Sequence, residues 1–151
     1  MNEKSTRRVF LKKSTEVAAA TAALTTLGGV HSSAQAKEGK LGIGIIGCGG
    51  IMTHHVSGLV GRKEAVEITH LCDVDTAQIN RMAKKVTQGF QPAPPKETQR
   101  YEDVINDKNV DGVIIATPHH WHAPIALAAM EAGKDVYIEK PVSHNIWEGR
   151  K

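Results

Sequence analysis

Short apolar runs alternate with amphipathic stretches along most of the chain. The runs are rich in β-branched residues and end at glycine, proline or aspartate, which is typical of strands buried in a parallel sheet. They predict strands at residues 41–46, 67–72, 110–116 and 135–139. Strands that are apolar on both faces need helices above and below them. The pattern therefore predicts an α/β fold with a doubly wound parallel sheet.

The stretches between these runs have the spacing of helices. One follows the first strand as far as about Gly61, and others are predicted at 77–86, 101–106 and 123–132, with a last helix beginning near Asn145. Asp75 or Thr76 can cap the second of these helices. Residues 91–96 contain three prolines and are predicted to form a loop.

Residues 1–36 differ from the rest in charge and composition. They hold five basic and two acidic residues, whereas the remaining 115 hold fourteen of each. The net charge of +3 therefore comes from this segment and does not indicate nucleic-acid binding. An Arg7-Arg8 pair, a mildly apolar run at 17–30 and an Ala34-Gln35-Ala36 sequence follow in the order of a cleaved export signal.

The arginine pair resembles the twin-arginine export signal of bacteria. We therefore expect residues 1–36 to be a signal peptide that engages the twin-arginine export machinery and directs the protein to the periplasm. Residues 37–151 then form the folded domain. Two alternatives are an amphipathic N-terminal helix of that domain and an uncleaved segment that anchors the protein in the inner membrane.

A glycine-rich segment joins the first strand to the first helix. Gly47 and Gly49 match the first two glycines of the dinucleotide-binding pattern, but Met52 stands at the third position. Asp73 ends the second strand, 26 residues beyond Gly47, where an acidic residue would bind the ribose hydroxyls. A carboxylate there disfavours a 2′-phosphate, so NAD is expected rather than NADP. The alternative is an ordinary tight turn with Asp73 as a solvated strand end.

Two further polar segments follow strands, at 117–122 and 139–141. Because ligands of open α/β sheets bind at the carboxyl ends of the strands, both segments are predicted to face the crevice of the glycine loop. His122 is a candidate to move protons near neutral pH, and Lys140 to polarise a carbonyl or hold a hydroxyl. Three histidines within residues 119–122 could instead bind a metal, but no cysteine or carboxylate lies beside them, so we expect none.

The sequences 116–122 and 129–141, the latter ending in Glu-Lys-Pro, resemble the Gfo/Idh/MocA family, and the resemblance covers residues 41–151. It implies a Rossmann domain that binds NAD(P), with Lys140 at the nicotinamide and substrate and His122 as its catalytic companion. The cofactor-binding positions that it implies are Gly47, Gly49, Gly50, Ile51, Asp73, Thr117, Pro118, His122, Glu139 and Lys140. The family usually has glycine or alanine where this chain has Met52, which is expected to tighten the helix–strand contact without abolishing binding.

The resemblance also implies a function. It points to an NAD(P)-dependent oxidoreductase that acts on a sugar, cyclitol or related polyol, with two alternatives: an NAD-dependent glycoside hydrolase of the same superfamily, or an inactive nucleotide-binding remnant. Family members continue into a second α/β domain, through which they associate. We therefore expect this chain to be an incomplete N-terminal portion of a homo-oligomeric protein. Cys48 and Cys72 are expected to be packing residues, although a disulfide between them is possible.

Overall fold

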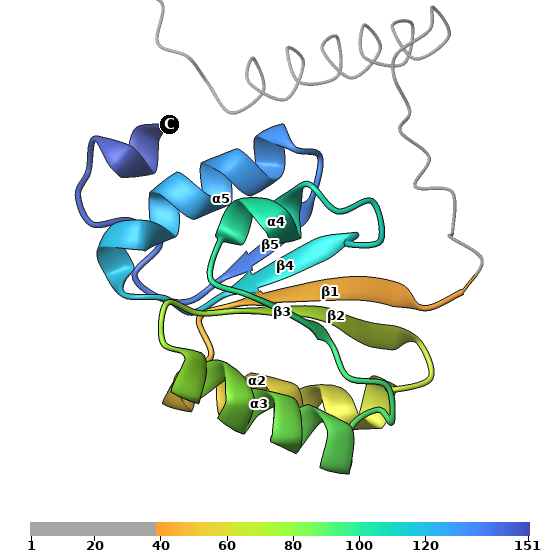
Figure 1. Cartoon of the computed structure of the whole chain (residues 1–151). Helices are drawn as coiled ribbons and strands as arrows, with labels where there is room; N and C mark the ends of the chain where they lie inside the picture. Colours follow the sequence, from red (N-terminus) through yellow and green to blue (C-terminus); the bar gives the residue numbers. More distant parts are fainter. Residues whose placement is uncertain (1–38) are drawn as a thin grey trace, which may run out of the picture. The chain divides into compact units, whose positions relative to one another are not determined.

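The computed structural model describes residues 39–151, which belong to the compact unit Lys37–Lys151. Five strands form one sheet in the order β3-β2-β1-β4-β5, and every pairing is parallel (Figure 1). The strands are β1 (Leu41–Ile46), β2 (Val66–Cys72), β3 (Lys96–Thr98), β4 (Gly112–Ile115) and β5 (Asp135–Ile138). The predicted doubly wound parallel sheet is confirmed.

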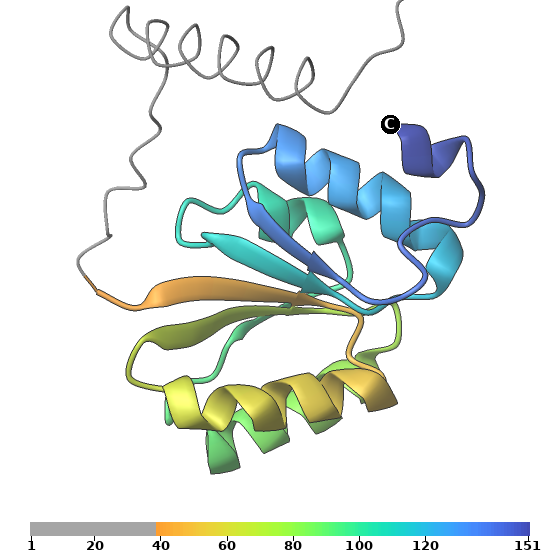
Figure 2. The same ribbon diagram turned by 180° about the vertical axis from the view of Figure 1, so that it is seen from behind.

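Two helices cover each face of the sheet (Figures 1 and 2). On one face lie α2 (Gly50–Leu59) and α3 (Thr76–Gly89), and on the other lie α4 (Tyr101–Ile105) and α5 (His122–Glu131). Short 3₁₀ turns occupy Val60–Arg62, His119–Trp121 and Glu148–Arg150. Asp75 caps α3, because its side chain accepts a hydrogen bond of 2.8 Å from the Ala77 N–H.

Each face of the sheet has its own hydrophobic core. Successive strand residues point to opposite faces, so Ile45 packs against α2 and α3 whereas Ile46 packs in the core formed with α4 and α5. In β2, Leu71 likewise packs in the core with α2 and α3, and Cys72 packs in the core with α4 and α5. This double burial explains why the strands read as continuous apolar runs.

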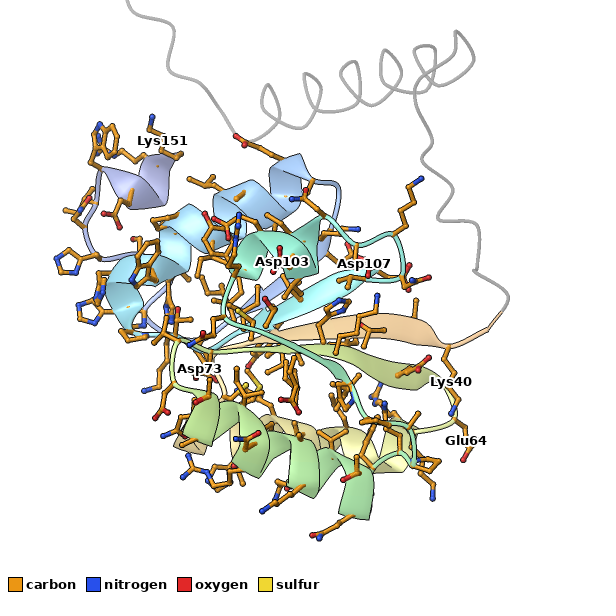
Figure 3. All side chains as sticks on the ribbon, viewed as in Figure 1. Lys40, Glu64, Asp73, Asp103, Asp107 and Lys151 are labelled. Carbon is orange, nitrogen blue, oxygen red and sulfur yellow. The ribbon has the colours of Figure 1, made fainter. Side chains whose placement is uncertain are left out.

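The order of the strands creates a crevice at one end of the sheet. The chain leaves β1 toward β2 across one face, but it leaves β4, on the other side of β1, toward β5 across the opposite face. The loops after β1 and β4 therefore diverge at their carboxyl ends, which is where open α/β sheets bind ligands. Asp73 lies at this end, and Asp107 lies at the other (Figure 3).

Two predicted elements are wrong. Residues 91–96 were expected to be loop throughout, but Lys96 begins the three-residue strand β3, which pairs with His70, Leu71 and Cys72 of β2. The helix expected from Asn145 is only a 3₁₀ turn at Glu148–Arg150. The Asn145 side chain there accepts a hydrogen bond of 2.9 Å from the Glu148 N–H, which is the contact of an N-cap residue, but only this short turn follows it.

The expectations for residues 1–36 fall outside the residues that the structure describes. Within residues 39–151, no helix is both long enough and apolar enough to cross a lipid bilayer.

Candidate functional site

The turn after β1 requires glycine at one position. Gly47 has φ +90°, and its N–H donates a hydrogen bond of 2.8 Å to the Cys72 carbonyl. A Cβ atom on Gly47 would lie 2.6 Å from the Ala116 carbonyl oxygen, so a side chain would collide with the end of β4. At Gly49 a Cβ atom would meet nothing within 4 Å. Gly49 thus leaves open space beside the first turn of α2.

The N-terminus of α2 suits an anion. Its N-cap residue is Gly49, which supplies no side chain to accept from the first amides. These N–H groups and the positive end of the helix dipole favour a phosphate. Met52, at the third position of the glycine pattern, is fully buried in the core between α2 and the sheet. The Met52 side chain, which stands where the family usually has glycine or alanine, therefore fills space between α2 and the sheet.

Asp73 is fixed at the end of β2 by two backbone amides. Its Oδ2 atom accepts a hydrogen bond of 2.7 Å from the Cys48 N–H, and its Oδ1 atom accepts one of 3.0 Å from the Asp75 N–H. The first bond joins the acidic residue directly to the glycine turn. The two features that the sequence analysis paired by spacing are thus in contact.

A cavity of about 850 Å³ opens at this end of the sheet. Five of the predicted cofactor-binding residues line it, namely Gly47, Gly49, Asp73, Thr117 and Pro118. Gly50, Ile51, His122, Glu139 and Lys140 do not line it. The cavity is large enough for a bound small molecule.

Several residues that line the cavity were not singled out by the sequence analysis. Tyr101 and Trp121 form part of its wall, with ring centroids 6.5 Å apart, and Gln78 of α3 lies near Asp73. Two buried side-chain oxygens that line the cavity, Gln78 Oε1 and Thr117 Oγ1, have no hydrogen-bond partner among the described residues. Buried polar atoms are normally paired, so these two oxygens have hydrogen-bonding capacity that the described residues leave unused.

Lys140 lies one strand away from the cavity. The Glu139 N–H donates a hydrogen bond of 3.0 Å to the Ile115 carbonyl, which keeps the end of β5 beside the end of β4. Lys140 follows with an exposed side chain, and the Lys140–Pro141 peptide bond is cis. The predicted lysine is therefore at the same edge of the sheet as the cavity.

His122 is buried at the start of α5, with 2% of its surface exposed. Its Nδ1 atom lies 2.6 Å from the Pro141 carbonyl oxygen, and its Nε2 atom lies 2.8 Å from the Thr117 carbonyl oxygen. The ring thus joins the segments that follow β4 and β5. Both nitrogens are engaged by backbone oxygens, which is the geometry of a residue that holds two loops together. The catalytic role of His122 stays a prediction.

The other histidines of this region do not gather around a common point. His119 stacks on His144 with centroids 4.8 Å apart, and His120 lines the cavity. Among residues 39–151, no group of three or more histidine, cysteine, aspartate or glutamate side chains could hold a metal ion.

A contact that the sequence analysis missed joins α2 to the end of β5. The Nε2 atom of His55 lies 2.6 Å from Oε1 of Glu139, and this hydrogen bond lowers the pKa of the Glu139 carboxyl. The only signal in the sequence is the position of His55 three residues after the buried Met52 on the same helix, because the two partners of the contact are 84 residues apart.

Both cysteines are free and buried. Burial, with a smaller contribution from Asp73, raises the pKa of the Cys48 and Cys72 thiols to about 12. The expectation that they are packing residues is confirmed.

These observations define a class of protein. A parallel sheet with a glycine turn, an unobstructed helix N-terminus and an acidic residue fixed to that turn is a dinucleotide-binding Rossmann domain. The open space at Gly49 fits a phosphate-bearing cofactor, and the unpaired Thr117 hydroxyl can donate to a polar ligand. The Gfo/Idh/MocA family model, described as an oxidoreductase family with an NAD-binding Rossmann fold, matches residues 41–151. The chain belongs to this family, and its cofactor is NAD.

Two solved structures show a similar fold. The WlbA dehydrogenase from Chromobacterium violaceum, determined with NADH and UDP-GlcNAcA, has 24% sequence identity and a TM-score of 0.65, over 76% of this chain and 31% of that one. The myo-inositol 2-dehydrogenase from Lactobacillus plantarum has 27% identity and a TM-score of 0.60, over 72% of this chain and 30% of that one.

Among curated proteins, a glycosyl hydrolase family 109 protein from Shewanella sp. strain ANA-3 is 35% identical over 162 aligned residues. The match covers 94% of this chain and 35% of the relative. The chain therefore spans about a third of the length of this relative and of a second one from Shewanella sp. strain MR-4.

Proposed function

We propose that the protein, when whole, is an NAD-dependent oxidoreductase that acts on a sugar, cyclitol or related polyol, and that Lys140 acts at the reacting oxygen. The observation that carries the proposal is the position of Lys140, which lies two residues beyond the end of β5, at the end of the sheet where the cavity opens. The substrate class is supported by the neighbours, since one is an inositol dehydrogenase and another was determined with a nucleotide sugar.

Different residues of the site would bind different parts of the cofactor and the substrate. The amides at the start of α2 would hold the pyrophosphate, and Asp73 would accept hydrogen bonds from the ribose hydroxyls. Bound NAD supplies the centre that accepts or donates a hydride. Lys140 offers three N–H donors on a flexible stem, so it can hold the substrate oxygen and transfer a proton there.

Replacement of Lys140 tests this proposal. In the whole protein, Lys140→Ala should lower turnover by about 100-fold to 10,000-fold, because a positioned proton donor or acceptor contributes that much. NAD affinity, measured by titration calorimetry, should change little, since Lys140 does not line the cavity. Lys108→Ala, at an exposed loop position, is the control. Near-normal turnover in Lys140→Ala would remove this residue from the mechanism.

A second candidate is an NAD-dependent glycoside hydrolase, which is favoured by the names of the curated relatives. The two activities differ in the fate of the cofactor, since a dehydrogenase accumulates NADH and the hydrolase regenerates its NAD. Incubation with NAD and a chromogenic glycoside, followed at separate wavelengths for NADH and for the released phenol, separates them. Phenol release without net NADH formation supports the hydrolase, and NADH formation from a free polyol supports the dehydrogenase.

A further inference from the structure

The helix of the glycine turn is joined to the strand end that carries Lys140. His55 in the second turn of α2 and Glu139 after β5 are 84 residues apart in sequence, yet their side chains meet at 2.6 Å. The exposed fractions of the two side chains are only 20% and 17%. Because an ionised carboxylate can only accept, the His55 Nε2 atom carries the proton and donates. A short, charge-assisted and mostly shielded bond of this kind is stronger than an ordinary surface pair.

The Glu139 carboxylate uses its second oxygen for the backbone of Lys140. Its Oε2 atom accepts a hydrogen bond of 3.2 Å from the Lys140 N–H. One carboxylate thus links the imidazole of α2 to the peptide group of the predicted catalytic residue. The ring of His55 also meets Tyr137 of β5 edge-on, with centroids 5.2 Å apart. Tyr137 of β5 and Glu139, two residues later, therefore fix the orientation of the ring.

The backbone on the other side of Lys140 is also tied down. Pro141 presents its carbonyl oxygen to His122 of α5, at 2.6 Å. The residues before and after Lys140 are thus held by one histidine from each face of the sheet, while its own side chain is exposed. A flexible lysine stem leaves the backbone as the main means of aiming its ammonium group.

We propose that His55 is a positioning residue for Lys140. Through Glu139 it couples the placement of Lys140 to α2, the helix whose N-terminus meets the cofactor. This inference rests on the proposed role of Lys140. It differs from a purely stabilising role because it requires that loss of His55 changes the response of Lys140 to NAD while the cofactor still binds.

A nuclear magnetic resonance experiment on the full chain tests the coupling without relying on turnover. Lysine side chains are labelled by reductive methylation with ¹³C-formaldehyde, and the Lys140 signal is assigned by its absence in Lys140→Arg. Titration with NAD should shift this signal in the unmodified chain. His55→Gln should lose most of the shift while still binding NAD. His54→Gln changes the exposed neighbour on the same helix, so it should behave as the unmodified chain does.

Turnover in the whole protein gives a second readout. His55→Gln should lower kcat about tenfold to a hundredfold, as expected when a reacting group is misplaced, and leave the KM for NAD within about twofold. Glu139→Gln should have a similar effect. Because both residues act through one contact, the double variant should lose no more than either single variant.

The outcomes separate the two proposals. If NAD binds but leaves the Lys140 signal of the unmodified chain unmoved, the role of Lys140 in the proposed function is wrong. If the shift is the same in the unmodified chain, His54→Gln and His55→Gln, the positioning role of His55 is overturned and the proposed function stands. If His55→Gln does not fold, Glu139→Gln decides by the same measurement.

Discussion

Gly47 and Gly49 serve different purposes in the turn after β1. Gly47 has a left-handed backbone and lies against the carbonyl of Ala116, so its small size is needed for the fold. Gly49 has an extended backbone and open space around its Cα atom, so its small size leaves room for a ligand.

The two alanine variants should therefore fail in different ways. Gly47→Ala should lower the free energy of unfolding by about 1–3 kcal/mol, the cost of backbone strain, with the collision adding to it. Gly49→Ala should change it by no more than about 0.5 kcal/mol but weaken NAD binding, because a methyl group enters the pyrophosphate site. Urea unfolding and NAD titration measure the two effects. Equal losses of stability would contradict this division.

Asp73 should control the choice of cofactor. In Asp73→Asn the hydrogen bonds to the ribose lose their charge, so NAD affinity should fall about tenfold. The difference in affinity between NAD and NADP should become smaller, because the carboxylate that repels a 2′-phosphate is gone. Dissociation constants for both cofactors provide the measurement. Asp103→Asn, in α4 and outside the cavity lining, should leave both unchanged. A preserved preference in Asp73→Asn would place the discrimination elsewhere.

For individual residues, the sequence predicts a role when that role depends only on residues nearby in the chain. Gly47 and Asp73 are recognisable because the turn and the strand end are local features, and the contact between Asp73 and the turn follows from the fold. The bond between His55 and Glu139 spans 84 residues, so no local pattern contains both partners. The other wall of the cavity, with Tyr101 and Trp121, depends in the same way on how α4 and α5 pack.

A polar cluster joins β2, β3 and the loop after α4. His70 is 3% exposed, and its Nε2 atom lies 3.4 Å from Asp107 Oδ2, which also accepts a hydrogen bond of 2.7 Å from Lys96. Burial lowers the pKa of His70 below its ordinary value of 6.5. The Lys96 hydrogen bond is the main reason that the pKa of Asp107 falls to about 2.

This cluster should make the domain less stable in mild acid. Below about pH 6.5 an unfolded His70 takes up a proton that the buried ring resists, so the free energy of unfolding should fall as the pH drops. For one proton the slope is at most about 1.4 kcal/mol per pH unit. Urea unfolding should be measured at several pH values between 7.5 and 5.5. The free energy of unfolding should depend less steeply on pH in His70→Gln than in the unmodified chain, whereas His54→Gln should keep the slope of the unmodified chain. Parallel curves for His70→Gln and the unmodified chain would refute the assignment.

Elements that pack apolar residues against a core were predicted well, including the four-residue strands β4 and β5, whereas β3 and the last turn were not. The strands and helices with buried faces, such as β2 and α3, carry their own periodicity. Strand β3 has three residues, two of them exposed, and exists because it pairs with β2. The turn at Glu148–Arg150 buries no residue, and two side-chain bonds join Asn145 to Glu148, so local contacts and not core packing define it.

For the molecule as a whole, we propose export to the bacterial periplasm through the twin-arginine route. The support is the paired arginine of residues 1–36 and a cofactor-binding domain, since this route carries folded proteins. Replacement of Arg7 and Arg8 by lysine should keep the protein in the cytoplasm, as judged by fractionation. Protein purified from the periplasm should carry bound nucleotide. Unchanged secretion of the lysine variant, or empty protein in high yield, would argue against this proposal.

The two buried thiols have a practical consequence for chemical labelling. A pKa near 12 in place of 9 means about a thousandfold less thiolate at neutral pH, and thiolate is the form that reacts with maleimides and iodoacetamides. Since the chain has only these two cysteines, the native protein should react very slowly with such reagents. Val74, which is 84% exposed at the rim of the cavity, could then carry a single dye through Val74→Cys. The fluorescence of that dye would report the arrival of the cofactor without removal of any native residue from the core.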